Sequence, residues 1–159
     1  MSRRLPGTLT TLVLAMSLIL STTGAGLGAP ADGSVLLTLS GNALSTTGVI
    51  RYEVTMVPLD SLAADLGIET RSAYEDRILV SRGKYKVDLG VGSSMAVVNG
   101  HEIRGIVPPT KENGQIMVPL RFLLENMGYD VAWQDGPQGT ADIRPIEEND
   151  IIIGTVRGV

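Results

Sequence analysis

The sequence predicts an α+β fold in which a mostly antiparallel sheet packs on two short helices. An internal repeat is the first reason. The tetrapeptide Met-Val-Pro-Leu at residues 56–59 recurs at residues 117–120, an offset of 117 − 56 = 61 residues, and the match continues to Gly67 and Gly128. The second reason is that turn signals separate short alternating segments along the chain. We therefore expect two weakly similar half-repeats that share one domain over residues 32–146.

Each half-repeat predicts one short helix, over residues 58–66 and 119–127. A proline begins each segment, where the missing N–H costs nothing, and a glycine follows it, where a left-handed cap is favoured. The apolar residues between them recur at i, i+3, i+4 and i+7, so each helix has one apolar stripe that must pack on the sheet. Asp65 and Asn126 fall outside the stripes, and we expect both to be exposed and cheap to replace. The two stripes are Leu59, Leu62, Ala63 and Leu66, and Leu120, Leu123, Leu124 and Met127.

Period-two alternation of apolar and polar residues predicts strands over residues 78–81, 85–89, 129–134 and 141–144. Hairpins are expected over residues 39–44 and 97–103, the second one turning at Asn99 and Gly100. Residues 108–114 are expected to form a loop and a turn. Because both helices are too short for βαβ crossovers, nothing in the sequence predicts a parallel pair of strands. Residues 147–159 form a tail that is apolar enough at 151–156 for one extra strand.

The first 31 residues have the pattern of a signal peptide. Arg3 and Arg4 are followed by an uncharged segment, and its most apolar part, residues 9–20, has the length of a signal-peptide hydrophobic region. Small residues then predict cleavage before Asp32, with a second candidate site before Gly26. The alternative is a membrane anchor that stays attached, although the apolar run is short for a full span. We expect a secreted or envelope-associated protein that meets a membrane only through an uncleaved N-terminal segment.

Composition excludes several function classes. The chain has no Cys and a single His, which rules out disulfides, Cys-based zinc sites and a three-His copper site within one chain. A formal charge of −4 and only one Trp, one Phe and four Tyr argue against nucleic-acid binding. No nucleophile, metalloprotease or nucleotide-binding motif is present. We expect no enzymatic activity and no cofactor.

The second half-repeat carries a family signature, which comprises Asn99-Gly100, residues 113–122, Glu125, Gly128, Val131 and Trp133. It resembles the copper amine oxidase N-terminal-like domain, also called the stalk domain, over residues 35–146. In the first half-repeat Asp60 and Ala64 replace the Arg and Glu of that pattern. The resemblance implies a small antiparallel sheet around a helix that projects from the oxidase and does not hold its copper. It also implies an exported protein of Gram-positive-type bacteria, of a kind often joined to wall-associated modules.

Three residues are candidates for function. Arg121 and Glu125 are four apart on one helix face and can form an ion pair, either as a structural pair that docks the helix end to a loop or as a partner-binding face. Trp133 lies on an alternating strand, and its neighbours and the family pattern favour packing in the core. The alternative for Trp133 is an exposed platform that stacks on a sugar.

Other polar groups are expected to be structural. His101 follows a hairpin turn and should be a surface residue, residues 90–94 lack the later Gly, the Lys and the helix of a phosphate loop, and the acidic residues 147–150 should be a solvated connector rather than a calcium site. The sequence thus predicts an exported non-catalytic stalk-type module for cell-surface structure or protein contacts. The alternative is a module that binds cell-wall glycan or peptidoglycan. The partner would be a surface protein or a cell-wall polymer.

Overall fold

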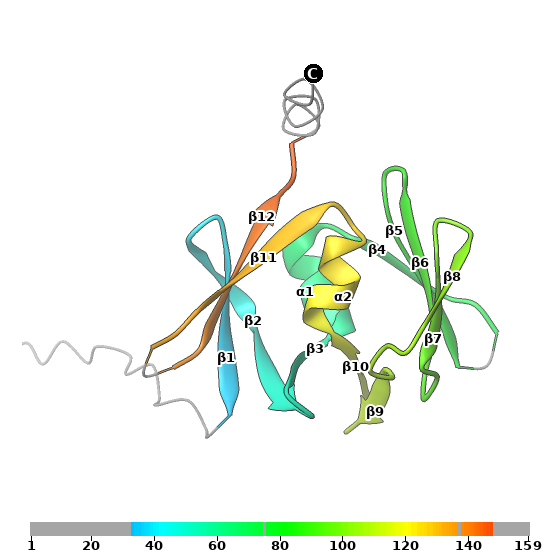
Figure 1. Ribbon diagram of the computed structural model, residues 1–159, viewed down its shortest axis with the longest axis horizontal. Coiled ribbons are helices and arrows are strands. Elements are labelled where there is room, and N and C mark those ends of the chain that lie inside the picture. The colour runs from blue at the N-terminus through cyan, green and yellow to red at the C-terminus, as the bar shows by residue number, and fades with distance from the viewer. Residues whose placement is uncertain (1–32, 75, 137, 148–159) are drawn as a thin grey trace, which may run out of the picture.

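The computed structural model describes residues 33–74, 76–136 and 138–147, and these form two sheets on either side of a pair of helices (Figure 1). The seven-stranded sheet has the order β11 (Tyr129–Gln134), β12 (Thr140–Pro145), β1 (Ser34–Leu39), β2 (Asn42–Arg51), β3 (Val54–Pro58), β10 (Gln115–Pro119) and β9 (Thr110–Glu112). The five-stranded sheet has the order β4 (Glu69–Ser72), β5 (Arg77–Arg82), β6 (Tyr85–Gly90), β7 (Met95–Val98) and β8 (His101–Arg104). The helices are α1 (Leu59–Leu66) and α2 (Leu120–Glu125). The predicted α+β class is confirmed.

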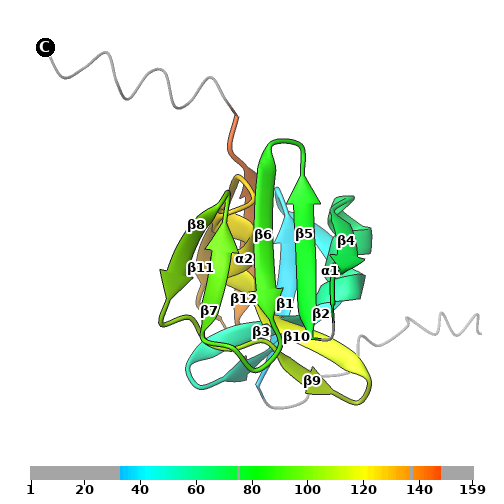
Figure 2. The ribbon, with the colours of Figure 1, turned by 90° about the vertical axis from the view of Figure 1, so that its right-hand side faces the viewer.

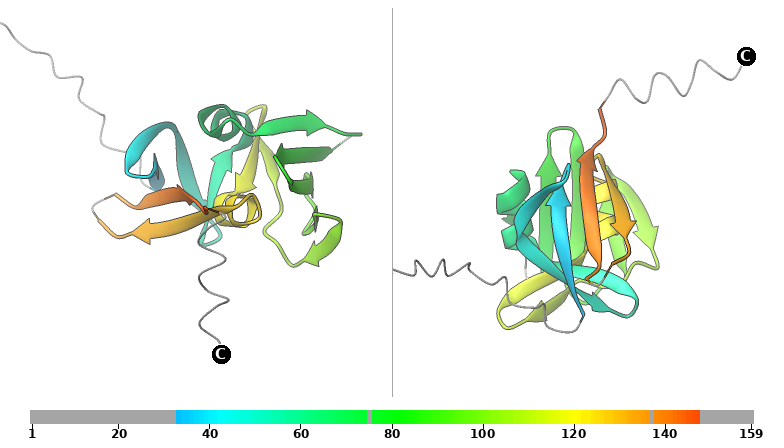
Figure 3. Two further views of the ribbon diagram at one scale, coloured as in Figure 1. Left: turned by 90° about the horizontal axis from the view of Figure 1, so that it is seen from above. Right: turned by 90° about the vertical axis from the view of Figure 1, so that its left-hand side faces the viewer.

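The core lies between the sheets and is built around the two helical stripes. Leu62, Leu123 and Leu124 are fully buried, and the neighbouring stripe residues are nearly so, except for Leu66. From the opposite sides, β1, β11 and β12 and then β5, β6 and β7 each contribute alternate apolar residues to the same cluster. Figure 3 shows the helices enclosed between the sheets when the molecule is viewed from above. Because one cluster contains residues from both half-repeats, neither half has a core of its own.

The half-repeats meet where β3 and β10 pair. Val57 lies opposite Val118, and these are equivalent positions because 118 − 57 = 61. The flanking pairs are Met56 with Pro119 and Pro58 with Met117. The 61-residue offset converts one of these pairs into the other, because 56 + 61 = 117 and 58 + 61 = 119. A local two-fold axis therefore passes between the two valines. The two copies of the tetrapeptide therefore pair with each other, and each copy leads into one of the two helices.

Both helices begin one residue later than predicted, because Pro58 and Pro119 are extended N-cap residues and not the first helical residues, and the two helices end differently. Gly67 closes α1 in the left-handed conformation, with a φ of 65°, and its N–H donates to the carbonyl of Ala63. The second helix ends at Glu125, two residues before the predicted end at Met127. A turn follows it and ends at Gly128, with a φ of 78°, and this turn carries Met127 into the core. The apolar stripe is therefore continuous although the helix is not.

The five-stranded sheet (Figure 2) holds the end of α2 through the turn between β5 and β6. The Nη1 atom of Arg82 donates to the carbonyl of Met127 at 3.0 Å, and its guanidinium lies 4.3 Å from the centre of the Tyr129 ring. The ring of Tyr85 covers Gly128 so closely that a Cβ atom there would lie 2.7 Å from the ring. These contacts dock one half-repeat on the helix of the other.

Two expectations about the strands are corrected by the structure. The pair β1–β12 is parallel, with Leu37 opposite Ala141, although nothing in the sequence predicted a parallel pair. No short crossover is needed, because almost the whole domain lies between these two strands in the chain. The interval at 108–114 is not all loop and turn, since Thr110–Glu112 forms β9 beside β10. In the second half-repeat, residues 105–109 thus separate β8 from β9. The first half-repeat has a single long strand, β2, at the corresponding place.

The predicted hairpins are present, with turns at Ser40-Gly41 and at Asn99-Gly100. The signal segment 1–31 and the possible strand at 151–156 lie outside the described residues, as does the acidic run apart from Glu147, which is exposed. Among the described residues no helix has the length and apolar character needed to cross a membrane.

Candidate functional site

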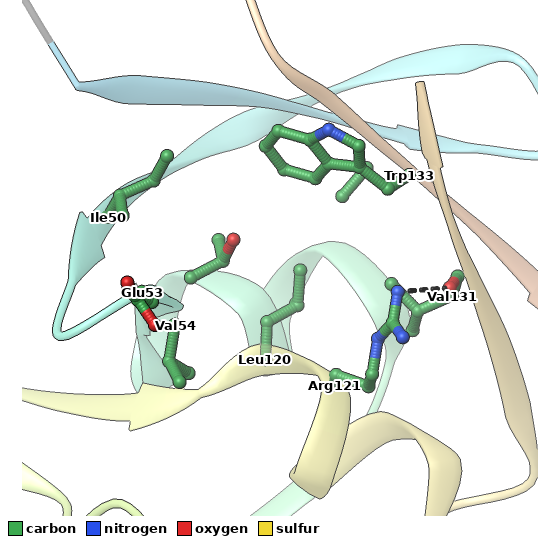
Figure 4. A pocket seen from close by; sticks show the side chains of 9 residues that line it. Ile50, Glu53, Val54, Leu120, Arg121, Val131 and Trp133 are labelled. Carbon is green, nitrogen blue, oxygen red and sulfur yellow. Dashed lines mark hydrogen bonds between the residues drawn. The ribbon is translucent and has the colours of Figure 1, made fainter. Parts of the chain in front are cut away.

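A cavity of about 400 Å³ opens between the β2–β3 and β11–β12 hairpins, beside the start of α2 (Figure 4). We call it the Trp133 groove, and nine residues define it: Ile50, Glu53, Val54, Thr55, Leu120, Arg121, Val131, Trp133 and Ala141. Its volume lies in the range of small-ligand sites, which commonly combine apolar walls with a few polar groups. The groove has that composition, since apart from Thr55 its polar side chains are those of Glu53 and Arg121.

Trp133 forms the upper wall of the groove and is held in one orientation. Its Nε1 atom donates to Oδ1 of Asp135 at 2.8 Å. The indole lies against Gly139, where a Cβ atom would come within 2.4 Å of the ring. The side chain is 40% exposed. An indole seated on backbone and fixed by its N–H is a preformed aromatic surface.

The expectation that Trp133 packs in the core is therefore wrong. Tyr129 and Val131 share its face of β11, and both are buried. The strand continues past the end of the helical layer, so the same face that covers the core at Val131 borders the groove at Trp133. Alternation identifies the face of a strand, but it does not indicate how far along the strand the core extends.

Arg121 and Glu125 lie on α2 as an i,i+4 pair, with Nε and Oε1 3.7 Å apart. Arg121 also donates from Nη2 to the carbonyl of Val131 at 3.3 Å, and this links the helix to β11 (Figure 4). Both side chains are about half exposed, so the ion pair itself is worth little. The bond to β11 places the guanidinium on one wall of the groove.

Sequence reasoning missed the opposite wall, which comes from the end of the β2–β3 hairpin. Ile50 and Glu53 lie there, and Figure 4 shows them across the groove from Arg121. The turn residues Tyr52 and Glu53 have φ values of 51° and 62°. Neither is a usual residue for a two-residue hairpin turn, so no turn signal marked this segment.

A second hollow of about 510 Å³ lies on the other side of the same turn. We call it the Pro108 hollow, and its walls are Arg51, Tyr52, Met56, Gly92, Val107, Pro108, Thr110 and Glu112. A weak ion pair at 4.0 Å joins Arg51 to Glu112 at its edge. Because Tyr52 borders this hollow and Glu53 borders the Trp133 groove, the turn separates the two.

The remaining candidates have structural positions. His101 is exposed at the start of β8, directly after its turn. In the described part of the chain no three His, Cys, Asp or Glu side chains are grouped so that they could hold a metal ion. Residues 90–94 form a turn that leads into β7 and not into a helix, and the N–H of Gly92 donates to the carbonyl of Pro109 at 2.7 Å.

Two carboxylates with shifted pKa values serve the fold and lie outside the groove. The Thr38 hydroxyl, the Gly41 N–H and Arg144 hold the pKa of Asp142 below its ordinary value. Desolvation alone would raise the pKa of Asp65, but hydrogen bonds from Ser45 and Thr46 outweigh it and lower that pKa. The expectation that Asp65 faces solvent freely is thus wrong.

The predicted exposed position of Asn126 is also corrected. Its side chain is half-buried, and Nδ2 donates to the carbonyl of Phe122 at 2.7 Å, which satisfies one of the last carbonyls of α2. Asp65 therefore ties α1 to strand β2, whereas Asn126 caps the last turn of its own helix.

Comparison with known proteins gives one match. The family model for the copper amine oxidase N-terminal domain matches residues 38–140. This range contains both helices and strands β2 to β11 in full, the last two residues of β1 and the first residue of β12. Searches of the curated proteins and of the solved structures found no match.

Proposed function

Because the chain belongs to the copper amine oxidase N-terminal domain family, a non-catalytic module, we propose that it is an exported module that makes contacts at the cell surface. The match across nearly the whole two-sheet domain carries this proposal. The Trp133 groove supports it, since its apolar walls and the polar side chains of Glu53, Thr55 and Arg121 can hold a ligand. The partner would be a surface protein or a cell-wall polymer.

Export is the first part of the proposal. Arg3, Arg4 and the uncharged apolar segment after them support cleavage before Asp32 or before Gly26. Mass spectrometry of the protein recovered from the culture medium or envelope of its native host should find one of these two N-termini. Recovery of the chain from soluble cytoplasm with Met1 still present would contradict export.

A wall-glycan-binding module is the second candidate, and the exposure of Trp133 favours it. The ring of a sugar presents C–H groups that pack on the electron-rich face of an indole, and its hydroxyls need the kind of polar partners that Glu53 and Arg121 offer. The fixed orientation of Trp133 lowers the entropy lost on binding.

Binding to purified cell wall tests this candidate. We expect the mature protein to sediment with wall material at low and at high salt, since the contact is largely uncharged. Trp133→Ala should abolish sedimentation. Tyr74→Ala is the matched control, because Tyr74 is an aromatic residue that is 93% exposed and lies outside the groove. Equal sedimentation of all three proteins would show that the groove takes no part in wall binding.

A further inference from the structure

The turn between β2 and β3 has an unusual composition for its conformation. Among the described residues six that are not glycine have a positive φ, and bulky side chains occupy both central positions of a turn only at Tyr52 and Glu53. Three of the others precede a glycine, namely Ser40, Asn99 and Asn113. A left-handed φ brings Cβ close to the backbone, which is why such turns favour Asn and Gly.

The fold does not require this choice, because the second half-repeat has a relaxed form of the same turn. Tyr52 and Glu53 correspond to Asn113 and Gly114, since 52 + 61 = 113 and 53 + 61 = 114. That turn joins β9 to β10 with φ values of 50° and 81°, in the same region of backbone conformation. The strained turn is thus specific to the first half-repeat, where its two central residues line the two hollows.

The strain places two useful side chains. Tyr52 is 85% exposed at the edge of the Pro108 hollow. Glu53 is exposed on the wall of the Trp133 groove, and Figure 4 shows its carboxylate at the side opposite Arg121. Because these residues are adjacent, a ligand that leaves the groove past Glu53 meets the ring of Tyr52 next. Strained backbone that displays binding groups is a common feature of functional sites.

We infer that a neutral sugar polymer is the ligand, and that it runs from the Trp133 groove across Tyr52 into the Pro108 hollow. This rests on the glycan-binding function proposed above and extends it from one sugar site to a chain. Trp133 and Tyr52 supply two aromatic surfaces for sugar C–H faces, and Glu53 between them accepts hydrogen bonds from hydroxyls. An anionic polymer fits poorly, since the carboxylate of Glu53 would lie on its path and the chain has a formal charge of −4.

Calorimetric titration with β-1,4-linked N-acetylglucosamine oligomers tests the inference. We expect the hexasaccharide to bind at least about tenfold more tightly than the disaccharide, as removal or addition of one aromatic contact commonly changes affinity by that factor. The double variant Tyr52→Asn/Glu53→Gly, which copies the relaxed turn, should lose this preference for the longer ligand. Its Tm should rise, because the strain is removed.

Two controls separate the possible outcomes. Asn113→Tyr/Gly114→Glu moves the strained pair to the other turn, and it should lower the Tm while both affinities stay unchanged. Trp133→Ala should weaken binding of both oligomers. If Trp133→Ala loses binding but Tyr52→Asn/Glu53→Gly keeps the full preference for the hexasaccharide, the glycan function stands and the inference about the turn is overturned. If the unchanged protein binds neither oligomer, or binds an extended peptide instead, both are overturned.

Discussion

Asp142 is a single residue that joins distant segments of the seven-stranded sheet by hydrogen bonds. Its carboxylate is almost completely buried and accepts hydrogen bonds from the Thr38 hydroxyl at 2.6 Å, the Gly41 N–H at 2.9 Å and Arg144 at 2.8 Å. Thr38 lies 104 residues away in the sequence, on the strand that pairs in parallel with β12. The carboxylate therefore fixes the parallel pair and the β1–β2 turn together.

These hydrogen bonds make the stability of the protein depend on pH. Because the folded pKa of Asp142 lies below the ordinary value of 3.8, its contribution is complete above that value and is lost as the pH falls through the folded pKa. We expect Asp142→Asn to lower the free energy of unfolding by about 1.5–3 kcal/mol at neutral pH, since bonds to a charged acceptor are lost. The difference between variant and unchanged protein should shrink at about pH 2.5. Urea denaturation at both pH values measures it, and an equal difference at both would contradict this role.

Asp65 gives a second prediction at this scale. Its carboxylate accepts hydrogen bonds from the Ser45 hydroxyl at 2.7 Å and from the Thr46 N–H at 2.9 Å, which joins α1 to β2. Asp65→Ala should destabilise by about 1–3 kcal/mol, because the buried N–H of Thr46 loses its acceptor. Glu125→Ala, which removes only an exposed ion pair, should cost at most about 0.5 kcal/mol. Thermal unfolding of the two variants compares them directly, and equal stability would show that the contact of Asp65 is dispensable.

At the scale of elements, the two glycines that follow the helices have equivalent positions but different surroundings. Gly67 and Gly128 are 61 residues apart and have φ values of 65° and 78°. A Cβ atom at Gly67 meets nothing within 4 Å, whereas at Gly128 it would meet the ring of Tyr85 at 2.7 Å. The difference arises because the five-stranded sheet docks on the end of α2 and leaves the end of α1 open.

This pair predicts unequal costs for the same substitution. Gly67→Ala should destabilise by about 1–2 kcal/mol, the cost of a left-handed residue with a Cβ. Gly128→Ala should cost clearly more, because it also displaces the Tyr85 ring from its contact. Urea unfolding of both variants, with Gly128→Ala/Tyr85→Ala as the control, tests the contact. If removal of the ring fails to recover part of the loss at Gly128, the steric explanation is wrong.

At the scale of the whole molecule, one core serves both half-repeats. Leu62 and Leu123 are fully buried in the same cluster, one on each helix. Leu62→Ala and Leu123→Ala should each destabilise by about 2–5 kcal/mol, as expected for buried leucines. Unfolding should follow a single transition by far-ultraviolet circular dichroism and by Trp133 fluorescence, because neither half can bury its apolar surface alone. Two separate transitions, or a large loss for only one of the leucines, would show that the halves are independent.

Features that depend on neighbours in the chain could be predicted from residue order. The prolines, the stripes and the glycines predicted both helices, and the turn at Asn99-Gly100 predicted its hairpin. The repeat and the family resemblance also follow from residue order, and the match over residues 38–140 confirms the family. These features can be predicted because periodicity, proline geometry and turn preferences act over a few residues.

Features that depend on contacts between distant residues became visible in the three-dimensional fold. It paired β1 with β12, brought Thr38 to Asp142, and turned Asp65 toward β2. It also placed Trp133 beyond the end of the core, and it brought the strained turn at Glu53 opposite α2 to form the groove. No local pattern encodes these positions, because each depends on where the sheets curve and end relative to two helices, and that geometry exists only once both half-repeats have packed together.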